Sequence, residues 1–324
     1  KAMRATVAHE FFHAIQRAYR PSSTTPTNVS YFYEFSSMWI EDVIVPDGDD
    51  YIYWVDPFFN APDQDISDTD GYSIALFGHY LSCVIDSSIN QLESSILKRM
   101  WERYSDVGNA FYAIENILSV DYNTDFSSSW VDFLSRNHFN GIYENNNNFY
   151  YYSDQQYLSP ISTSVSFLND DINVELIISE ESAGFKSFYL SNGGTISIDN
   201  SIIPSNAQYN GTIAIESNDS GLNALYDSDN EVYYLNSGSY VHFSYSGYGD
   251  SIVDINVDFE SDVNIINGDL NFDQSVNIQD IILMIEFIFG DISFNQFQFE
   301  AGNINSDDYC NIFDIIMIID IILD

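Results

Sequence analysis

Basic residues are scarce in this chain of 324 residues, and their scarcity excludes whole classes of partner. Only 9 lysines and arginines stand against 49 aspartates and glutamates, and none of the 9 follows Lys186. Nucleic acids and anionic lipid surfaces are bound by basic side chains that neutralise phosphate, so we expect neither as a partner. A formal charge of −40 favours cations instead.

Cysteine and long apolar stretches are equally scarce. The two cysteines, Cys83 and Cys310, form no CxxC pair, so they support neither a disulfide framework nor a cysteine zinc site. No run of 18 apolar residues occurs, and the sequence therefore predicts no transmembrane segment. Apolar residues still make up 45 % of the chain and aromatic residues 16 %, which predicts a folded protein rather than a disordered acidic tail.

The hydrophobic period divides the chain into three regions, in agreement with the two or three domains expected from its length. Residues 1–150 have helical spacing, 155–260 alternate with a period of two, and 264–324 are helical with an internal repeat. We expect a multidomain α+β protein with a mainly helical first lobe, a β-sandwich in the middle and a small helical C-terminal domain. The sequence begins at Lys1 without an initiator methionine or a signal peptide, so we expect an N-terminal portion to precede it.

The same periodicity predicts the individual elements. Expected helices cover residues 2–19, 29–44, 71–88, 91–105, 108–119 and 125–138. Expected strands cover residues 163–167, 174–178, 195–198, 211–215 and 251–257.

The sequence HEFFH at residues 9–13 is an HExxH motif inside a predicted helix. Residues four apart lie on one helix face, so both imidazoles can bind a single Zn²⁺ while Glu10 lies within reach of a water on the metal. The chain has only five histidines, and two of them are in this motif. We predict one catalytic zinc, with His9 and His13 as ligands and Glu10 as the general base.

Catalytic zinc usually has three protein ligands, so a third ligand is required. The extended pattern HExxHxxGxxH is not met, because Gln16 and Tyr19 stand where it has glycine and histidine. A carboxylate must take that place, and Glu34 on the next predicted helix is the first choice, with Glu41 as the alternative. Glu41 or Asp42 could instead be the acceptor that orients a ligating histidine.

The motif and Glu34, with 20 residues between Glu34 and His13, resemble the gluzincins, the thermolysin-like superfamily in which a glutamate on the next helix follows HExxH. More narrowly, HEFFHAIQ followed by EFSSMWIED and Asp50-Tyr51 resembles a bacterial family of secreted metalloproteases that often carry C-terminal secretion or docking modules. The resemblance covers roughly residues 5–145. It implies that Glu34 is the third zinc ligand and that a sheet precedes the motif helix, with an edge strand that binds substrate.

The resemblance implies hydrolysis of peptide bonds in a protein or peptide substrate. In this mechanism zinc polarises the carbonyl and lowers the pKa of its water, and Glu10 passes the proton to the leaving amine. Gluzincins usually add a tyrosine or histidine that stabilises the oxyanion, and Tyr72 and His79 are the catalytic candidates, with Tyr72 preferred. The sequence departs from thermolysin at Met38, where thermolysin has an aspartate, so the partners of the histidines stay open.

Two twelve-residue segments near the C-terminus align with an offset of 34 residues. Oxygen-bearing side chains recur at positions 1, 3, 5, 9 and 12, with a backbone carbonyl expected at position 7, which is the arrangement that wraps Ca²⁺. The first calcium has the predicted ligands Asp269, Asn271, Asp273, Ser275, Asn277 and Asp280. The second has Asn303, Asn305, Asp307, Tyr309, Asn311 and Asp314, and its initial asparagine predicts weaker binding.

Aspartate at position 12 and the absence of glycine at position 6 distinguish these loops from an EF-hand. Duplicated loops of this kind, each followed by an apolar helix, resemble a type I dockerin, which implies two structural Ca²⁺ and a calcium-dependent fold for 264–324. In dockerins the helices bind a cohesin domain on a scaffold protein, in the extracellular space. The implied partner-binding residues are Ile278, Gln279, Ile312 and Phe313.

These motifs predict a secreted zinc metallopeptidase of gluzincin type that a dockerin attaches to a cohesin scaffold or to the cell surface. The alternative is a catalytically inactive, calcium-dependent adhesion or scaffold protein. The intact set of His9, Glu10, His13 and Glu34 favours the enzyme, because an inactive relative would be free to lose one of them. Aromatic residues in the β domain are ordinary strand formers and do not decide between the two.

Overall fold

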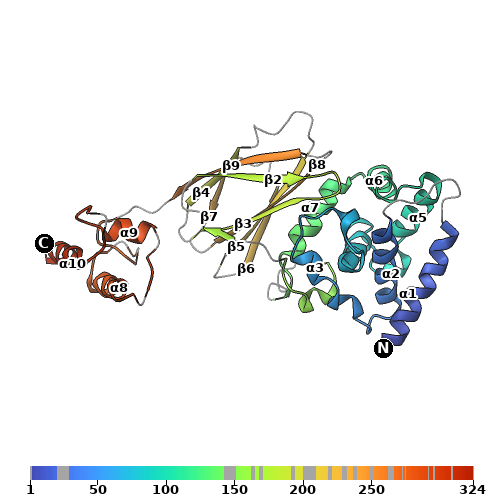
Figure 1. Ribbon diagram of the computed structural model, residues 1–324, viewed down its shortest axis with the longest axis horizontal. Helices are drawn as coiled ribbons and strands as arrows, with labels where there is room; N and C mark the ends of the chain where they lie inside the picture. The colour runs from blue at the N-terminus through green and yellow to red at the C-terminus, as the bar shows by residue number, and fades with distance from the viewer. Residues whose placement is uncertain are drawn as a thin grey trace. The chain divides into compact units, whose positions relative to one another are not determined.

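The computed structural model divides into two compact units and has a mixed α and β architecture (Figure 1). The first unit comprises Lys1–Ser191 with Ile196–Phe259, and the second comprises Asn192–Thr195 with Glu260–Asp324. The structure describes residues 2–19, 29–141, 151–161, 165–167, 171–190, 194–199, 209–217, 221–227, 232–235, 239–247, 251–261, 266–271, 273, 275–290, 292–294, 296–307 and 309–323.

Helices α1 to α7 belong to the first unit. Their bounds are α1 (Ala2–Gln16), α2 (Ser30–Ile44), α3 (Asp56–Phe59), α4 (Ala75–Tyr80), α5 (Ile96–Val107), α6 (Ala110–Asp121) and α7 (Phe126–Asn137). The helix expected over 71–88 is divided into a 3₁₀ turn at Tyr72–Ile74, helix α4 and a π-helical turn at Leu81–Ile85. The helix expected over 91–105 begins only at Ile96, because Asn90 caps a separate 3₁₀ turn before it.

An aromatic core holds these helices together. Trp130, Phe77 and Phe133 meet with ring centroids 5.0 to 5.3 Å apart, and Trp101 stacks on Phe32 of α2 at 4.3 Å. All five rings are buried, and each contributes about 1.5–3 kcal/mol by leaving water. Helix α2 is therefore fixed by its packing, and so are the acidic side chains that it carries.

The strands form two sheets. Their bounds are β1 (Val165–Phe167), β2 (Ile172–Ile178), β3 (Gly184–Leu190), β4 (Gly194–Asp199), β5 (Tyr209–Ser217), β6 (Gly221–Asp227), β7 (Val232–Leu235), β8 (Ser239–Gly247) and β9 (Ser251–Ser261). One sheet has the order β1-β3-β8-β5-β6, in which β1 pairs parallel with β3 and the other pairs are antiparallel. The second sheet has the order β2-β9-β4-β7, and its β2–β9 pair is antiparallel.

Helix α7 packs against β5 and β8 of the first sheet. The Ser135 and Ser244 hydroxyls lie 3.2 Å apart, and the rings of His138 and His242 have centroids 3.3 Å apart. This contact explains why the helices and the sheets belong to one compact unit.

His242 makes the stability of the first unit sensitive to acid. Its side chain is buried in β8, and burial lowers its pKa from the usual 6.5 to about 3. Between these values the unfolded chain holds a proton that the folded chain lacks, so the stability is full above pH 6.5 and falls as the pH falls. Between pH 6.5 and pH 5 the wild type should therefore lose about 2 kcal/mol of unfolding free energy through His242. We expect His242→Gln to lack this part of the loss. Urea denaturation followed by tryptophan fluorescence measures this difference, and equal losses in both proteins contradict it.

The second unit contains α8 (Ile278–Phe289), α9 (Gln296–Gly302) and α10 (Ile312–Leu323). Leu270, Met284, Ala301 and Ile318 form the centre of its small core. Gly302 lies against this core, because a Cβ at this position would be 2.8 Å from the end of the Met284 side chain, which would have to move. No helix among the described residues is both long and apolar enough to cross a membrane.

Candidate metal centre

Helix α1 presents the two histidines of the HExxH motif on one face. The rings of His9 and His13 have centroids 4.7 Å apart and lie nearly perpendicular, one turn apart, as the i, i+4 spacing predicts. His9 is buried and His13 is half-buried, because α1 packs against α2. The motif thus places a pair of imidazoles beside α2.

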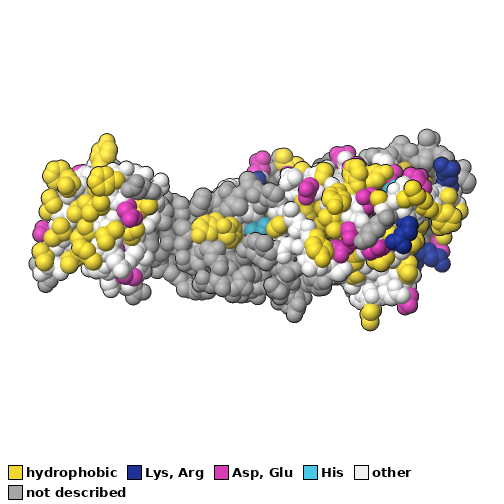
Figure 2. Space-filling model, turned by 90° about the horizontal axis from the view of Figure 1, so that it is seen from below, with side chains coloured by type: hydrophobic (Ala, Val, Ile, Leu, Met, Phe, Trp, Pro, Cys, Tyr) yellow, Lys and Arg dark blue, Asp and Glu magenta, His cyan; other side chains and the backbone are white. Residues whose placement is uncertain are grey.

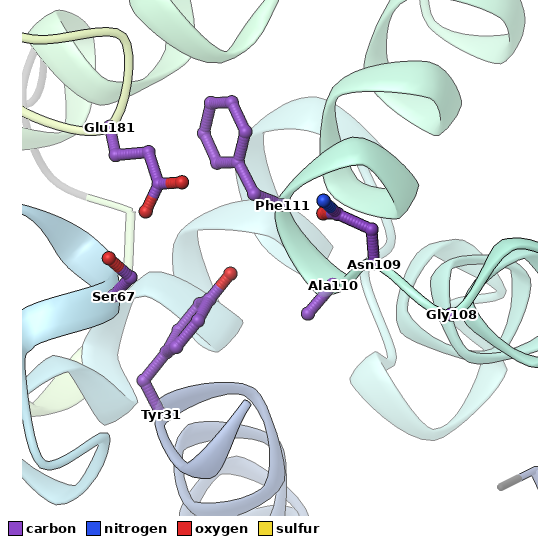
Figure 3. A pocket seen from close by; sticks show the side chains of 7 residues that line it. All are labelled: Tyr31, Ser67, Gly108, Asn109, Ala110, Phe111 and Glu181. Atoms are coloured by element: carbon purple, nitrogen blue, oxygen red, sulfur yellow. The ribbon is translucent and has the colours of Figure 1, made fainter. Parts of the chain in front are cut away.

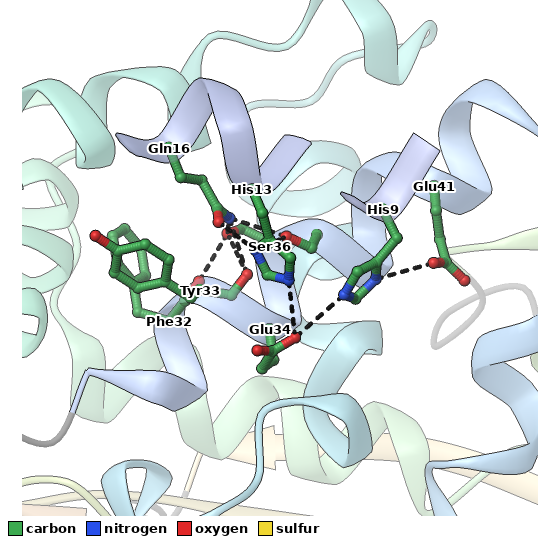
Figure 4. Close-up of polar contacts among 9 residues, drawn as sticks. His9, His13, Gln16, Phe32, Tyr33, Glu34, Ser36 and Glu41 are labelled. Atoms are coloured by element: carbon green, nitrogen blue, oxygen red, sulfur yellow. Dashed lines mark hydrogen bonds and ion pairs between the residues drawn. The ribbon is translucent and has the colours of Figure 1, made fainter. Parts of the chain in front are cut away.

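Glu34 of α2 faces both rings (Figure 4). Its Oε2 lies 3.2 Å from His9 Nε2 and 3.3 Å from His13 Nε2. Ligands arranged tetrahedrally at about 2.0–2.1 Å from zinc lie about 3.3–3.4 Å from one another. Both distances from Glu34 to the rings therefore match the spacing of ligands around a tetrahedral metal ion, and one ligand atom from each of the three residues lies within 4.8 Å of the other two.

Polar side chains engage the outer nitrogens of both rings. His9 Nδ1 lies 3.0 Å from Glu41 Oε2, and His13 Nδ1 lies 2.7 Å from Gln16 Oε1. The Gln16 amide nitrogen donates to the Tyr33 carbonyl oxygen at 2.9 Å, which leaves its oxygen as the acceptor toward His13. Both rings can therefore donate from Nδ1 and present Nε2 to the centre of the cluster, the tautomer that a metal ligand needs.

This geometry bears on the choice between Glu34 and Glu41. Glu34 lies on the Nε2 side of both rings, whereas Glu41 is buried and contacts the outer nitrogen of His9. Gln16 takes the equivalent place behind His13. In the sequence Gln16 stands out only as a departure from the extended motif, although its spacing of three residues from His13 predicts that the two side chains meet on one helix face.

The cluster shifts the pKa values of its members. The pKa of His9 is raised to about 9: burial lowers it, but hydrogen bonds with Glu34 and Glu41 and the charges of these carboxylates outweigh burial. The pKa of Glu34 is lowered, because hydrogen bonds with His9 and Tyr72 and the charges of His13 and His9 outweigh the upward effect of burial. At neutral pH His9 therefore holds a proton that an incoming metal ion must displace.

Glu10 and Tyr72 flank the cluster. Glu10 is exposed next to His9 on α1. The ring of Tyr72 stacks on that of His9 with centroids 5.7 Å apart, and its hydroxyl hydrogen-bonds to Glu34. Burial, that hydrogen bond and the charge of Glu34 raise the pKa of Tyr72 to about 12. The hydroxyl of Tyr72 therefore keeps its proton at neutral pH and can act as a hydrogen-bond donor.

The approach of Tyr72 depends on Gly71. This glycine has φ +85°, and a Cβ there lies 2.5 Å from the Tyr31 carbonyl oxygen and 2.7 Å from the Glu34 Cβ. Only glycine permits both this conformation and so close a crossing of α2.

His79, the other predicted oxyanion candidate, lies outside the cluster. It is fully buried in α4, where Nδ1 lies 2.9 Å from Gln91 Oε1 and Nε2 lies 3.6 Å from Asp42 Oδ2. Its ring stacks on Tyr152 with centroids 3.9 Å apart. Burial lowers the pKa of His79 to about 3, so the ring is neutral at pH 7. All six residues of α4 are buried, so His79 is part of the packed core.

The two predicted calcium loops repeat the same hydrogen bonds. Asp280 and Asp314, at position 12, accept through Oδ2 from the backbone N–H of position 9, at 2.8 and 2.9 Å. In each loop the position 3 Oδ1 accepts from the N–H of position 5, at 3.0 and 2.9 Å. Both position 12 aspartates are fully buried. The position 6 residues, Gln274 and Asp308, lie outside the described residues.

The predicted partner-binding residues lie at the starts of α8 and α10. Ile278 is 64 % exposed, Ile312 63 % and Phe313 64 %, and Gln279 is also exposed. Hydrophobic side chains gather on the surface of the second unit, as Figure 2 shows. The small core of this unit therefore leaves part of the apolar surface of α8 and α10 exposed to solvent.

A separate polar pocket of ≈ 210 Å³ lies between α2, α6 and the turn before β3 (Figure 3). The Tyr31 hydroxyl and Glu181 Oε2 are buried at this pocket and have no hydrogen-bond partner among the described residues. Burial raises the pKa values of both groups, so Tyr31 stays protonated. The pocket has room for more than one water molecule, so waters can hydrogen-bond to both groups.

No protein-family model and no curated protein matches this chain. Among solved structures, the periplasmic lysozyme inhibitor PliG of Salmonella Typhimurium, an inhibitor of g-type lysozyme, aligns with 9 % identity and a TM-score of 0.22. The alignment covers 31 % of this chain and 100 % of that protein. At this TM-score the likeness supports no conclusion about fold or function.

Proposed function

We propose that this chain is a zinc-dependent metallopeptidase of gluzincin type that acts outside the cell. The observation that carries the proposal is the convergence of His9 Nε2, His13 Nε2 and Glu34 Oε2, with Glu41 and Gln16 behind the two rings. Two imidazole nitrogens and one carboxylate oxygen are a typical ligand set for catalytic zinc, with the fourth position kept for water or substrate.

Zinc, when bound, supplies a Lewis acid that polarises the scissile carbonyl and lowers the pKa of a water molecule. Glu10 takes the proton of the attacking water and delivers it to the leaving amine. Tyr72, whose ring stacks on that of His9, donates a hydrogen bond from its hydroxyl to the developing oxyanion. Glu41 and Gln16 hold the two rings with Nε2 inward.

Metal analysis combined with casein hydrolysis tests this proposal. We expect about one zinc per chain, cleavage of casein, loss of cleavage with a zinc chelator and recovery when zinc is restored. A chain that binds no zinc under saturating conditions contradicts the proposal.

We propose in addition that the second unit is a type I dockerin with two structural Ca²⁺, which binds a cohesin scaffold domain, and that the two sheets form a β-sandwich. The hydrogen bonds common to both loops support the dockerin proposal, as do the exposed apolar residues Ile278, Ile312 and Phe313. Because millimolar calcium is an extracellular condition, this also supports secretion or attachment to the cell surface.

Calcium removal is expected to destabilise the second unit. The buried carboxylates of Asp280 and Asp314 repel their acidic neighbours without a cation, and ligand at 100 to 1,000 times its Kd stabilises a fold by about 2.7–4.1 kcal/mol per site. In calorimetry of the full chain, EGTA should lower the melting temperature of this unit by on the order of 10 °C or more. A double Asp280→Asn, Asp314→Asn variant should lose most of this response. A melting temperature that EGTA leaves unchanged contradicts the prediction.

The second candidate function is a calcium-dependent adhesion or scaffold protein without catalysis, which the exposed apolar surface of the second unit favours. This alternative predicts binding of a scaffold partner with no zinc and no hydrolysis. The metal analysis above separates the two functions.

A further inference from the structure

A second acidic cluster lies at the C-terminal end of α2. Asp42 of that helix, Asp49 in the following loop and Asp154 in the segment Ser153–Tyr157 bring carboxylate oxygens within 4.8 Å of one another. Asp42 is 2 % exposed and Asp154 8 %, while Asp49 is half-buried. The charges that act most strongly on Asp42 are those of Asp154, Asp49 and Glu41, which are all negative. Carboxylates this close in a poorly hydrated site are neutralised either by a proton held among them or by a bound cation.

Neutral donors satisfy only part of the cluster. The Tyr152 hydroxyl donates to Asp42 Oδ2, and the Tyr51 hydroxyl donates to Asp154 Oδ2 at 3.1 Å. Asp42 Oδ1 is buried and has no hydrogen-bond partner among the described residues. An unpaired buried carboxylate oxygen is costly, so this atom indicates a missing partner.

His79 gives an independent indication of a cation. Gln91 Oε1 accepts from Trp39 Nε1–H at 3.0 Å, which identifies this atom as the amide oxygen. His79 Nδ1, 2.9 Å from the same oxygen, must therefore donate, and the neutral ring has a lone pair at Nε2. This Nε2 is fully buried, has no hydrogen-bond partner in the described part of the chain, and lies 3.6 Å from Asp42 Oδ2. Two electron-rich atoms that face each other in this way need either a proton between them or a cation beside Asp42.

We propose that Asp42, Asp49 and Asp154 bind one Ca²⁺. Carboxylate oxygens are the ligands that hard cations prefer, and Ca²⁺ accepts six to eight oxygens in irregular geometry, including waters. Mg²⁺ demands near-ideal octahedral geometry. Zn²⁺ favours nitrogen and sulfur, and His79 Nε2, although it lies near Asp42, does not belong to the group of three mutually close ligand atoms, which are all oxygens. This site is separate from the zinc cluster and belongs to a different unit from the two calcium loops.

Calcium at this site joins three segments of the first unit. It binds the end of α2 to the loop that follows it and to residues 153–157, which are distant along the chain. Because Glu41 precedes Asp42 and contacts His9 Nδ1, the ion also fixes the carboxylate behind one of the two motif histidines. The ion is therefore structural, and its binding does not depend on whether the zinc cluster is catalytic.

Calcium titration of the metal-stripped full chain tests the site. We expect Asp49→Asn and Asp154→Asn each to bind one Ca²⁺ fewer than the wild type, or to bind it at least about tenfold more weakly, since calcium affinity falls with ligand charge. The matched control is Asp47→Asn, because Asp47 lies in the same loop but is exposed and paired with Arg4 at 2.8 Å. This control should leave the stoichiometry unchanged.

Thermal unfolding of the first unit, followed by tryptophan fluorescence, gives a second measurement. Without calcium, Asp49→Asn should melt at a higher temperature than the wild type, because it removes repulsion between carboxylates. With calcium this order should reverse. If both variants bind as much calcium as the wild type and respond equally to it, the proposal is wrong. Zinc bound at this site in place of calcium also overturns it. The Asp280→Asn, Asp314→Asn variant distinguishes the sites, since it must retain this one equivalent.

Discussion

Glu10→Gln is expected to keep zinc bound and to lose peptide hydrolysis. Glutamine has the shape of glutamate but cannot take a proton from water, and general acid–base catalysis contributes about 10²–10⁴-fold in rate. Glu10 is exposed and does not contact the ligand atoms of the cluster in the described structure, so its replacement should leave zinc binding within about twofold. The measurements are kcat/KM on casein-derived peptides and the zinc content of the purified variant.

A matched control for this variant is Glu102→Gln on α5. Glu102 is exposed like Glu10, and it pairs with Lys98 one turn away, so its replacement should change neither rate nor zinc content. If Glu10→Gln hydrolyses peptides at the wild-type rate, another group is the general base. If it loses zinc together with activity, its effect is structural and the assigned role is wrong.

The HExxH helix was predictable because its information is local. His9 and His13 are four residues apart in a stretch without glycine or proline, so the helix period alone brings their rings together. The position of Glu34 could not be predicted from local spacing, because the sequence of a second helix does not determine how that helix packs on the first. The resemblance to gluzincins suggested Glu34, and the structure places its Oε2 beside both Nε2 atoms.

Contacts between distant residues were beyond sequence reasoning. Asp42 and Asp154 are joined only by the packing of residues 151–157 against α2, and no short motif marks that contact. The resemblance to gluzincins suggested His79, but its helix is buried on every side, and a family pattern cannot distinguish a packed histidine from a catalytic one.

The strands were also only partly predictable from the sequence. The strands expected at 195–198, 211–215 and 251–257 correspond to β4, β5 and β9, because their residues alternate cleanly. Strands β3 and β8 were not predicted, since both mix aromatic residues with serine, and β3 also contains a lysine and β8 a histidine. Burial on both faces of β8, which contacts α7 as well as its own sheet, removes the alternation that identifies a half-exposed strand.

Replacement of Glu34 is expected to weaken zinc binding more than replacement of Glu41. A structural zinc site with four ligands is worth about 10–16 kcal/mol, so the loss of one ligand charge in Glu34→Gln should cost on the order of 10²–10³-fold in affinity. Glu41→Gln removes a charge that acts through His9, and such partners of ligands usually contribute about 10–100-fold. Competition with a chromophoric zinc chelator measures both affinities under the same conditions.

The order of these two effects decides which carboxylate is the ligand. Glu34 Oε2 is close to Nε2 of both histidines, whereas Glu41 reaches only the outer nitrogen of His9, and an outer partner orients a ring without binding the ion. Glu34→Gln should therefore lose both zinc and hydrolysis, while Glu41→Gln should recover hydrolysis when zinc is raised to saturation. If Glu41→Gln proves the more damaging and excess zinc fails to restore it, Glu41 is the third ligand and α2 must turn to present it.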